Sequence, residues 1–143
     1  MTIKLRLATL NDADFLLMCR NDIVTRLASS SADEVTREEH LKWLNSVIND
    51  PARKLYIAME NTTPAGTVRA DQQDDVTELS WTVSPDARGK GIGEKMIKIL
   101  ASQIKGSICA RIKTSNIASI NIAKSLGMEL YKEEDDMLYF IRP

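Results

Sequence analysis

Hydrophobic and polar residues recur with clear periods along most of this 143-residue chain. Residues 3–8, IKLRLA, alternate apolar and polar side chains, which is the pattern of a half-buried strand. A helix is predicted to follow, with Asn11 or Asp12 as its N-cap and its end near Asn21. Residues 24–35 are rich in serine and show no clear period, so they are predicted to form a loop with room for a short helix.

A capped helix is predicted next, over residues 37–49. Thr36, with a glutamate three residues later, has the form of a capping box. Leu41, Leu44 and Ile48 recur at helical spacing and are predicted to share the buried face of this helix.

Strands dominate the middle of the chain. The polar turns NTTPAG and DQQDD separate two predicted antiparallel strands, residues 54–59 and 66–71, and a further strand, residues 76–83. After these the pattern predicts a helix over 91–105 ended by Gly106, a strand over 107–113, a helix over 117–126 ended by Gly127, and a closing hairpin. This order predicts an α/β (α+β) fold with a mixed, mostly antiparallel central sheet of about six to seven strands and helices on both faces.

The composition fits a single folded domain over residues 1–143. Hydrophobic residues make up 43% of the chain and charged residues 27%, which is ordinary for a globular protein. A formal net charge of −1 argues against a general nucleic-acid or membrane-surface binder, and no apolar run is long enough to cross a membrane. Cys19 and Cys109 belong to no Cys-x-x-Cys motif, and the first residues do not resemble a signal peptide. We therefore expect free thiols, no metal site, no membrane insertion and a cytoplasmic location.

The densest chemical signal is a cluster of glycines. Three of the six glycines stand at positions 89, 91 and 93, between a predicted strand and an amphipathic helix, with Arg88 and Lys90 beside them. Glycine lets backbone N–H groups approach an anion closely, and a helix N-terminus favours negative charge. The stretch is therefore predicted to bind a phosphate group, with a glycine-rich loop that binds nothing as the alternative.

Two common phosphate-binding motifs do not fit this cluster. The Walker motif requires a glycine where Ser84 stands and a hydroxyl residue where Gly91 stands. A dinucleotide-binding G-x-G-x-x-G motif requires a glycine at position 94 or 96, which hold Glu94 and Met96. A phosphate bound here would therefore belong to another kind of ligand.

The run Arg88-Gly89-Lys90-Gly91-Ile92-Gly93 fits the pattern R/Q-x-x-G-x-G/A, and here the chain resembles the GNAT superfamily of N-acetyltransferases. The resemblance implies a fold of the acyl-CoA N-acyltransferase type and acetyl-CoA as the acetyl donor. It also implies acetyl transfer to a primary amine by direct attack, with no covalent enzyme intermediate. The residues that the resemblance places at the cofactor are Val83, Arg88, Gly89, Lys90, Gly91, Ile92, Gly93, Asn116 and Ser119.

Family features are also expected on either side of the loop. In the family, the strand before the loop splays from its neighbour, so that a backbone N–H, here that of Val83, bonds the thioester carbonyl. Downstream, Asn116 and Ser119 match the family pattern Asn-x-x-Ala/Ser, and Asn116 would bond the pantetheine or pyrophosphate arm. The chain differs from the family pattern at Ala123, where many members carry the tyrosine that protonates the leaving thiolate.

Acid–base chemistry is expected to centre on Glu78. A typical amine has a pKa near 10 and is mostly protonated at pH 7, so a base is useful. Glu78 lies five residues before Val83, so strict alternation places it on the opposite face of the strand; its alternative role is a solvated or salt-bridged strand residue. Tyr131 and Tyr139 are candidates for the acid that protonates the thiolate, with packing as their alternative role and solvent as an alternative acid.

The acceptor site is predicted to involve residues 20–45. The layout of this region looks like the subgroup that acetylates nucleotide-linked amino sugars, on the strength of Arg20, Asn21, Arg26, His40 and Trp43. The small-molecule acceptor is expected to contact Arg26, His40, Trp43 and Arg69. Each of these residues has a structural alternative, which is core packing for the histidine and the tryptophan and a surface ion pair for Arg69.

Other functions stay open at this point. The acceptor could be a protein or peptide N-terminus, a polyamine or a drug. A non-catalytic acetyl-CoA-binding module is favoured by Ala123, whereas Glu78 and the intact glycine loop favour an enzyme. Many members of the family form dimers, so a homodimer is also considered, although the sequence shows no diagnostic interface.

Overall fold

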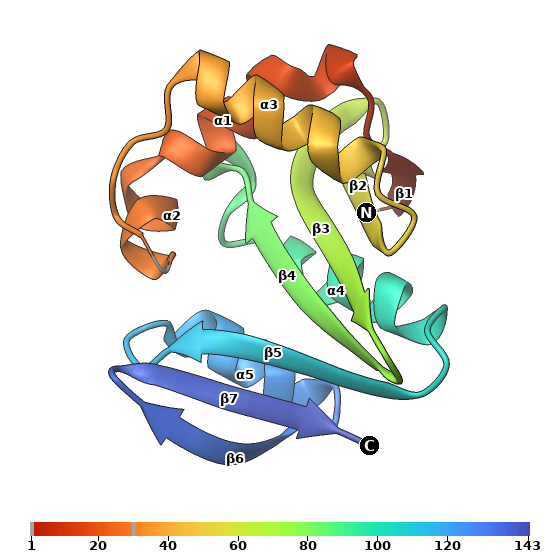
Figure 1. The fold of residues 1–143 in the computed structure, drawn as a ribbon, viewed down its shortest axis with the longest axis vertical. Helices are drawn as coiled ribbons and strands as arrows, with labels where there is room; N and C mark the ends of the chain where they lie inside the picture. Colours follow the sequence, from red (N-terminus) through yellow and green to blue (C-terminus); the bar gives the residue numbers. More distant parts are fainter. Residues whose placement is uncertain (1, 30) are drawn as a thin grey trace.

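The computed structural model describes residues 2–29 and 31–143, which form one sheet flanked by helices (Figure 1). The strands are β1 (Ile3–Leu7), β2 (Arg53–Glu60), β3 (Thr63–Gln73), β4 (Val76–Val83), β5 (Ser107–Lys113), β6 (Glu129–Glu134) and β7 (Met137–Arg142). The helices are α1 (Ala13–Asn21), α2 (Ile23–Ala28), α3 (Arg37–Ile48), α4 (Ile92–Ser102) and α5 (Ile117–Ser125), with 3-10 turns η1 (Leu10–Asp12) and η2 (Pro85–Ala87).

Within these described residues the sheet has seven strands in the order β1-β2-β3-β4-β5-β7-β6. Only β4 and β5 run parallel to each other, and every other neighbouring pair is antiparallel. The tight hairpins depend on Asn61, Asp74, Asp135 and Asp136, whose φ angles of 51 to 64° suit short polar side chains. The predicted mixed, mostly antiparallel sheet is confirmed.

Helices cover both faces of the sheet, also as predicted. Helices α4 and α5 pack on one face over a core that includes Met96 and Leu100, and α1 and α3 pack on the other over Leu44 and Ile57. Side chains along a strand alternate between faces, so Ile57 belongs to the α1–α3 core and Ala58 to the α4–α5 core.

The caps of the first helices are partly as expected. Thr36 caps α3 as predicted, because the Glu39 N–H donates to its Oγ1 at 3.1 Å. Asp12, one of the two predicted caps, is the N-cap position of α1, but its side chain makes no capping hydrogen bond to this helix. Thr9 caps the η1 turn, its own N–H donates to Asp12 Oδ2 at 2.9 Å, and α1 begins only at Ala13.

The buried face of α3 differs from the prediction. The buried stripe is His40, Leu44 and Val47, whereas Leu41 is half-buried and Ile48 is 38% exposed. The helix is therefore rotated by about one residue position relative to the predicted face, and the rotation buries the only histidine.

The structure also gives the exact ends of two predicted helices. The short helix expected near residues 24–35 is α2, which begins at Ile23, and the helix predicted over 91–105 ends at Ser102. Gly106, with φ of 91°, then turns the chain into β5.

Candidate active site

Strands β4 and β5 separate along their length. They pair only at their starts, through Val76 with Ser107, Thr77 with Ile108 and Glu78 with Cys109. From residue 79 onward β4 pairs with β3 alone, and the two strands diverge towards their carboxyl ends (Figure 1). The splayed strand implied by the family resemblance is thus present in the described chain.

The divergence leaves backbone groups of β4 facing the gap. The Ser84 N–H donates to the carbonyl oxygen of Ala65 at 2.8 Å. Antiparallel pairs alternate between hydrogen-bonded and non-hydrogen-bonded, so the adjacent pair, Val83 with Gly66, exchanges no hydrogen bonds. The N–H of Val83 therefore points away from β3, into the gap.

The glycine loop, residues 88–93, connects the end of β4 to the start of α4. Gly89 and Gly91 have φ of 81° and 75°, and a Cβ at either would meet none of the described atoms within 4 Å. Gly91 is the N-cap of α4, and none of the described side chains caps this helix. Its first N–H groups are therefore open to a ligand, which suits the pyrophosphate of acetyl-CoA.

Gly93 holds the loop close to the splayed strand. A Cβ at this position would lie 3.2 Å from both Val83 Cγ2 and Ile122 Cδ1, closer than side chains normally pack. Glycine thus lets the first turn of α4 contact β4 and α5 directly. The Ile92 side chain is buried, at 1% exposed, so only its backbone is placed to serve a ligand.

The basic residues of the loop already have partners. Arg88 Nη2 donates to Asp22 Oδ2 at 2.6 Å and to Thr25 Oγ1 at 3.3 Å, and Lys90 Nζ lies 4.0 Å from Glu60 Oε1. The hydrogen bond from Arg88 lowers the pKa of Asp22 below its usual range. Arg88 therefore joins the loop to α2, and contact of Arg88 or Lys90 with a phosphate stays a prediction.

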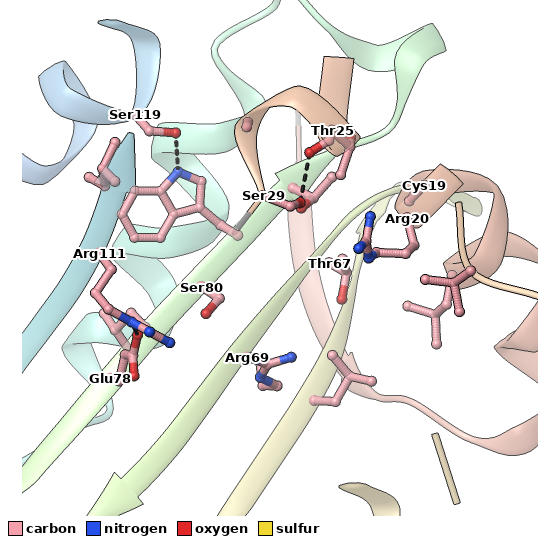
Figure 2. Close-up of a pocket in the computed structure, with 18 of the residues that line it drawn as sticks. Cys19, Arg20, Thr25, Ser29, Thr67, Arg69, Glu78, Ser80, Arg111 and Ser119 are labelled. Atoms are coloured by element: carbon pink, nitrogen blue, oxygen red, sulfur yellow. Dashed lines mark hydrogen bonds and ion pairs between the residues drawn. The ribbon is translucent and has the colours of Figure 1, made fainter. Parts of the chain in front are cut away.

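Asn116 and Ser119 lie at the start of α5, beside the gap. Asn116 Oδ1 accepts the Ser119 N–H at 3.2 Å and so caps the helix. Ser119 Oγ accepts the indole N–H of Trp81 at 3.2 Å (Figure 2). From the sequence alone, Trp81 could either stack on a base or sugar or pack in the core or at its rim, and the sequence does not distinguish these roles.

A cavity of about 540 Å³ opens on the α1–α3 side of the sheet. Most of its walls come from α1, α2, α3 and the strands β3, β4 and β5, with single residues from β2, α5 and β7 (Figure 2). Of the predicted site residues, those that line it are Glu78, His40, Trp43, Arg69, Asn116 and Ser119. The cavity joins the predicted acceptor region to the diverging strands.

Three of the predicted catalytic and acceptor residues lie outside the cavity lining. Arg26 is in α2, with Nη1 3.9 Å from Glu34 Oε1. Tyr131 and Tyr139 stand on the β6–β7 hairpin with their rings 6.2 Å apart in an edge-to-face contact, and Tyr131 is 57% exposed. The structure thus shows the packing role for the tyrosines, and their role as acids stays a prediction.

Glu78 lies in the cavity wall and in an ion pair at the same time. Its Oε2 accepts from Arg111 Nε at 2.7 Å, and this hydrogen bond raises the pKa of Arg111 (Figure 2). Strand β4 keeps its register with β3, so Glu78 faces the cavity while Val83 packs against Gly93 on the other face. The opposite-face prediction is confirmed.

His40, Trp43 and Arg69 lie together on the far wall. The His40 and Trp43 ring centroids are 5.4 Å apart, and the Arg69 guanidinium lies 5.5 Å from the Trp43 ring centroid. His40 is 4% exposed, and its Nδ1 has no hydrogen-bond partner in the described residues. Burial, followed by the positive charges of Arg20 and Arg37, lowers the pKa of His40.

The thiols are not arranged for nucleophilic catalysis. Burial raises the pKa of Cys19 to about 12, and burial followed by the charge of Glu78 raises the pKa of Cys109. No three His, Cys, Asp or Glu side chains cluster as metal ligands in residues 2–29 and 31–143.

Comparison with known protein families matches residues 2–129 to the acetyltransferase (GNAT) domain. The chain belongs to the GNAT acetyltransferase family. It is an acetyl-CoA-dependent N-acetyltransferase. None of the curated proteins matches the sequence.

Solved structures share the fold of this GNAT domain. A domain from Methanocaldococcus jannaschii has a TM-score of 0.87 at 24% identity, over 99% of this chain and 97% of its own. A putative acetyltransferase from Salmonella typhimurium, with acetyl-CoA, has a TM-score of 0.80 at 21% identity, over 99% and 94%. Spermidine N-acetyltransferase from Vibrio cholerae, in complex with CoA and spermine, has a TM-score of 0.88 at 16% identity, over 98% and 94%. At these identities the likeness concerns the fold.

None of the helices in the described parts of this GNAT chain is both long enough and apolar enough to span a bilayer.

Proposed function

We propose that this GNAT enzyme acetylates the primary amine of a small molecule that enters the 540 Å³ cavity. The observation that carries the proposal is the divergence of β4 and β5 beyond Glu78. Through this gap the pantetheine arm of acetyl-CoA, held at the glycine loop, can reach the cavity from the α4–α5 side of the sheet. The acceptor approaches from the α1–α3 side, so the two substrates meet at β4.

The residues on both sides of the gap have separate tasks. The N–H groups of Gly91, Ile92 and Gly93 bind the pyrophosphate, and the Val83 N–H holds the thioester carbonyl. Bound acetyl-CoA supplies an acetyl group on a thiol leaving group. The position of Val83 at the end of the gap orients this carbonyl towards the cavity.

Glu78 acts as the base in this proposal. It faces the cavity and takes a proton from the acceptor amine, directly or through a water molecule. Arg111 donates to Oε2 only, so it holds the carboxylate in place while Oε1 stays available to the acceptor.

Solvent is the proposed proton source for the departing thiolate. Ala123 has no hydroxyl group and is fully buried in the α4–α5 core, at 0% exposed. The two candidate tyrosines do not line the cavity. A thiol has a pKa of roughly 8.5, so the thiolate can leave without a strong acid.

We propose a nucleotide-linked amino sugar as the acceptor. The cavity has the size typical of small-molecule sites and offers Trp43 for stacking, with His40 and Arg69 beside it. Protein or peptide N-termini and small amines are the competing acceptors. The Vibrio cholerae relative, a spermidine enzyme, represents the polyamine alternative.

Isothermal titration with acetyl-CoA tests the loop. Gly91→Asp should weaken binding about tenfold or more, because its carboxylate would face the pyrophosphate. Gly91→Asn is the matched control, since asparagine has the same size, carries no charge and also tolerates a positive φ. Absence of binding to the folded wild-type protein would overturn the proposal.

Turnover is then measured as release of free CoA thiol with a panel of amines. Nucleotide-linked amino sugars should react faster than peptides or polyamines. Acetyl-CoA binding without acetylation of any amine would instead support a non-catalytic module.

A further inference from the structure

The cavity wall carries more positive than negative charge. Its arginines are Arg20, Arg69 and Arg111, and its carboxylates are Glu39 and Glu78. Arg111 is neutralised by Glu78 at 2.7 Å. Glu39 lies in the first turn of α3, where its Oε1 accepts from the Thr36 hydroxyl, so it compensates the helix terminus.

Arg69 is only half neutralised. Asp71 accepts from Arg69 Nε at 3.0 Å, and its other oxygen accepts from Arg53 Nε at 3.1 Å. One carboxylate therefore serves two guanidinium groups, which leaves an excess positive charge at the edge of the cavity.

Arg20 has no carboxylate partner in the described chain. Its Nη2 donates to the carbonyl oxygen of Ser31 at 3.2 Å, and its Nη1 is buried without a partner. The guanidinium extends from α1 towards Thr67, and both residues line the cavity (Figure 2). A permanently charged group with an unused buried donor is suited to bind an acceptor atom on a ligand.

His40 is a second, independent unsatisfied group in the same wall. It is more than nine-tenths buried, and Nδ1 lacks a partner in the part of the chain that the structure describes. Its lowered pKa keeps the ring neutral near pH 7, so one ring nitrogen can donate an N–H to an anion.

We propose that the acceptor amine carries an anionic group, either a carboxylate or a phosphate, and that Arg20 binds this group with the help of His40 Nδ1. The inference rests on the proposed function and names the substrate class of that site. It follows that polycationic amines are poor acceptors, because an acceptor with several positive charges would meet Arg20, unpaired in the described chain, and the half-neutralised Arg69 in the cavity.

Inorganic phosphate and acetate are the probes for the first test. The protein is saturated with CoA so that the glycine loop is occupied, and each anion is titrated at constant ionic strength. Phosphate, acetate or both should bind the wild-type protein, and Arg20→Gln should weaken that binding about tenfold or more, the factor expected for a charge-assisted hydrogen-bond pair. The anion that binds more tightly shows whether the anionic group of the acceptor is a phosphate or a carboxylate.

Arg37→Gln is the matched control, because Arg37 lies outside the cavity lining, is 59% exposed, and also contributes positive charge at His40. It should change anion binding by less than twofold. Equal anion binding by the wild type and Arg20→Gln, or no anion binding by the wild type, would overturn the inference. An equal loss of anion affinity in Arg37→Gln and Arg20→Gln would also overturn it. Such a result would indicate a general effect of positive charge rather than a binding site.

Arg20→Lys keeps the charge and covers the case in which the glutamine variant does not fold. It should retain part of the anion affinity, since lysine lacks the two-pronged donor geometry. CoA binding is measured on the same samples. Unchanged CoA binding with lost anion binding separates this inference from the proposed function, which is tested by CoA binding and by turnover of amines.

Discussion

The contact between Asp22 and Arg88 joins the glycine loop to α2 and offers a sharp test of how the loop is held. The substitutions are Asp22→Asn, Arg88→Gln and the double variant. Asp22 Oδ2 also accepts the Thr25 N–H at 3.3 Å and caps α2. Asparagine is an equally good N-cap, so Asp22→Asn removes the charge and keeps the cap.

The magnitude follows from the partial exposure of the pair. The Asp22 side chain is 17% exposed and the Arg88 side chain 33%. A fully exposed ion pair contributes about 0–1 kcal/mol and a hydrogen bond to a charged group about 1.5–3 kcal/mol, so we expect a coupling free energy of about 1 kcal/mol. For 143 residues the entropy of unfolding is about 0.3 kcal/mol/K, so each single variant should lower Tm by about 3 °C.

The pH dependence has a definite sign. The pKa of Asp22 is lowered in the folded protein, so the stabilisation is complete above the pKa of the unfolded chain and is lost as the pH falls through the lowered pKa. The free-energy difference between the wild type and Asp22→Asn should therefore be constant near neutral pH and shrink below about pH 4.

The assay combines urea unfolding with isothermal titration of acetyl-CoA. If Arg88 only holds the loop, Asp22→Asn and Arg88→Gln lose acetyl-CoA affinity equally, and the double variant loses no more. If Arg88 also binds phosphate, Arg88→Gln loses much more than Asp22→Asn. Additive stability effects in the double-mutant cycle, with zero coupling, would refute the reasoning.

Two further outcomes are expected. Glu78→Gln should lower kcat by about 100- to 10,000-fold while acetyl-CoA affinity stays unchanged, and a kcat within threefold of the wild type would exclude Glu78 as the base. Because the pKa of His40 is lowered by burial, the wild-type protein should lose stability relative to His40→Asn as the pH falls from about 6.5 through the lowered pKa; parallel stability–pH curves for the two proteins would contradict this.

The fold was predictable because its local signals agree with its tertiary structure. The hairpins carry short polar residues that tolerate a positive φ, such as Asn61 and Asp74, between strands of clear pattern. The glycines at 89, 91 and 93 stand at the start of an amphipathic helix, so the phosphate loop could be located from the sequence as well.

Side-chain contacts between residues far apart in the sequence were not predictable. Nothing in the local pattern indicates that Arg88 would bond to Asp22, 66 residues away, or that Glu78 would pair with Arg111. The buried face of α3 was misassigned because Leu41 and Ile48 are apolar and His40 is not, and only packing against the sheet decides which stripe is buried.

The burial of Cys19 has a consequence for the chemistry of the product. Each turnover releases CoA as a free thiol, and Cys19 lines the cavity. With a pKa of about 12, almost none of the Cys19 thiol is ionised at pH 7, and only the ionised form attacks a disulfide. The enzyme can therefore work among oxidised and reduced forms of CoA without becoming trapped as a mixed disulfide at this residue.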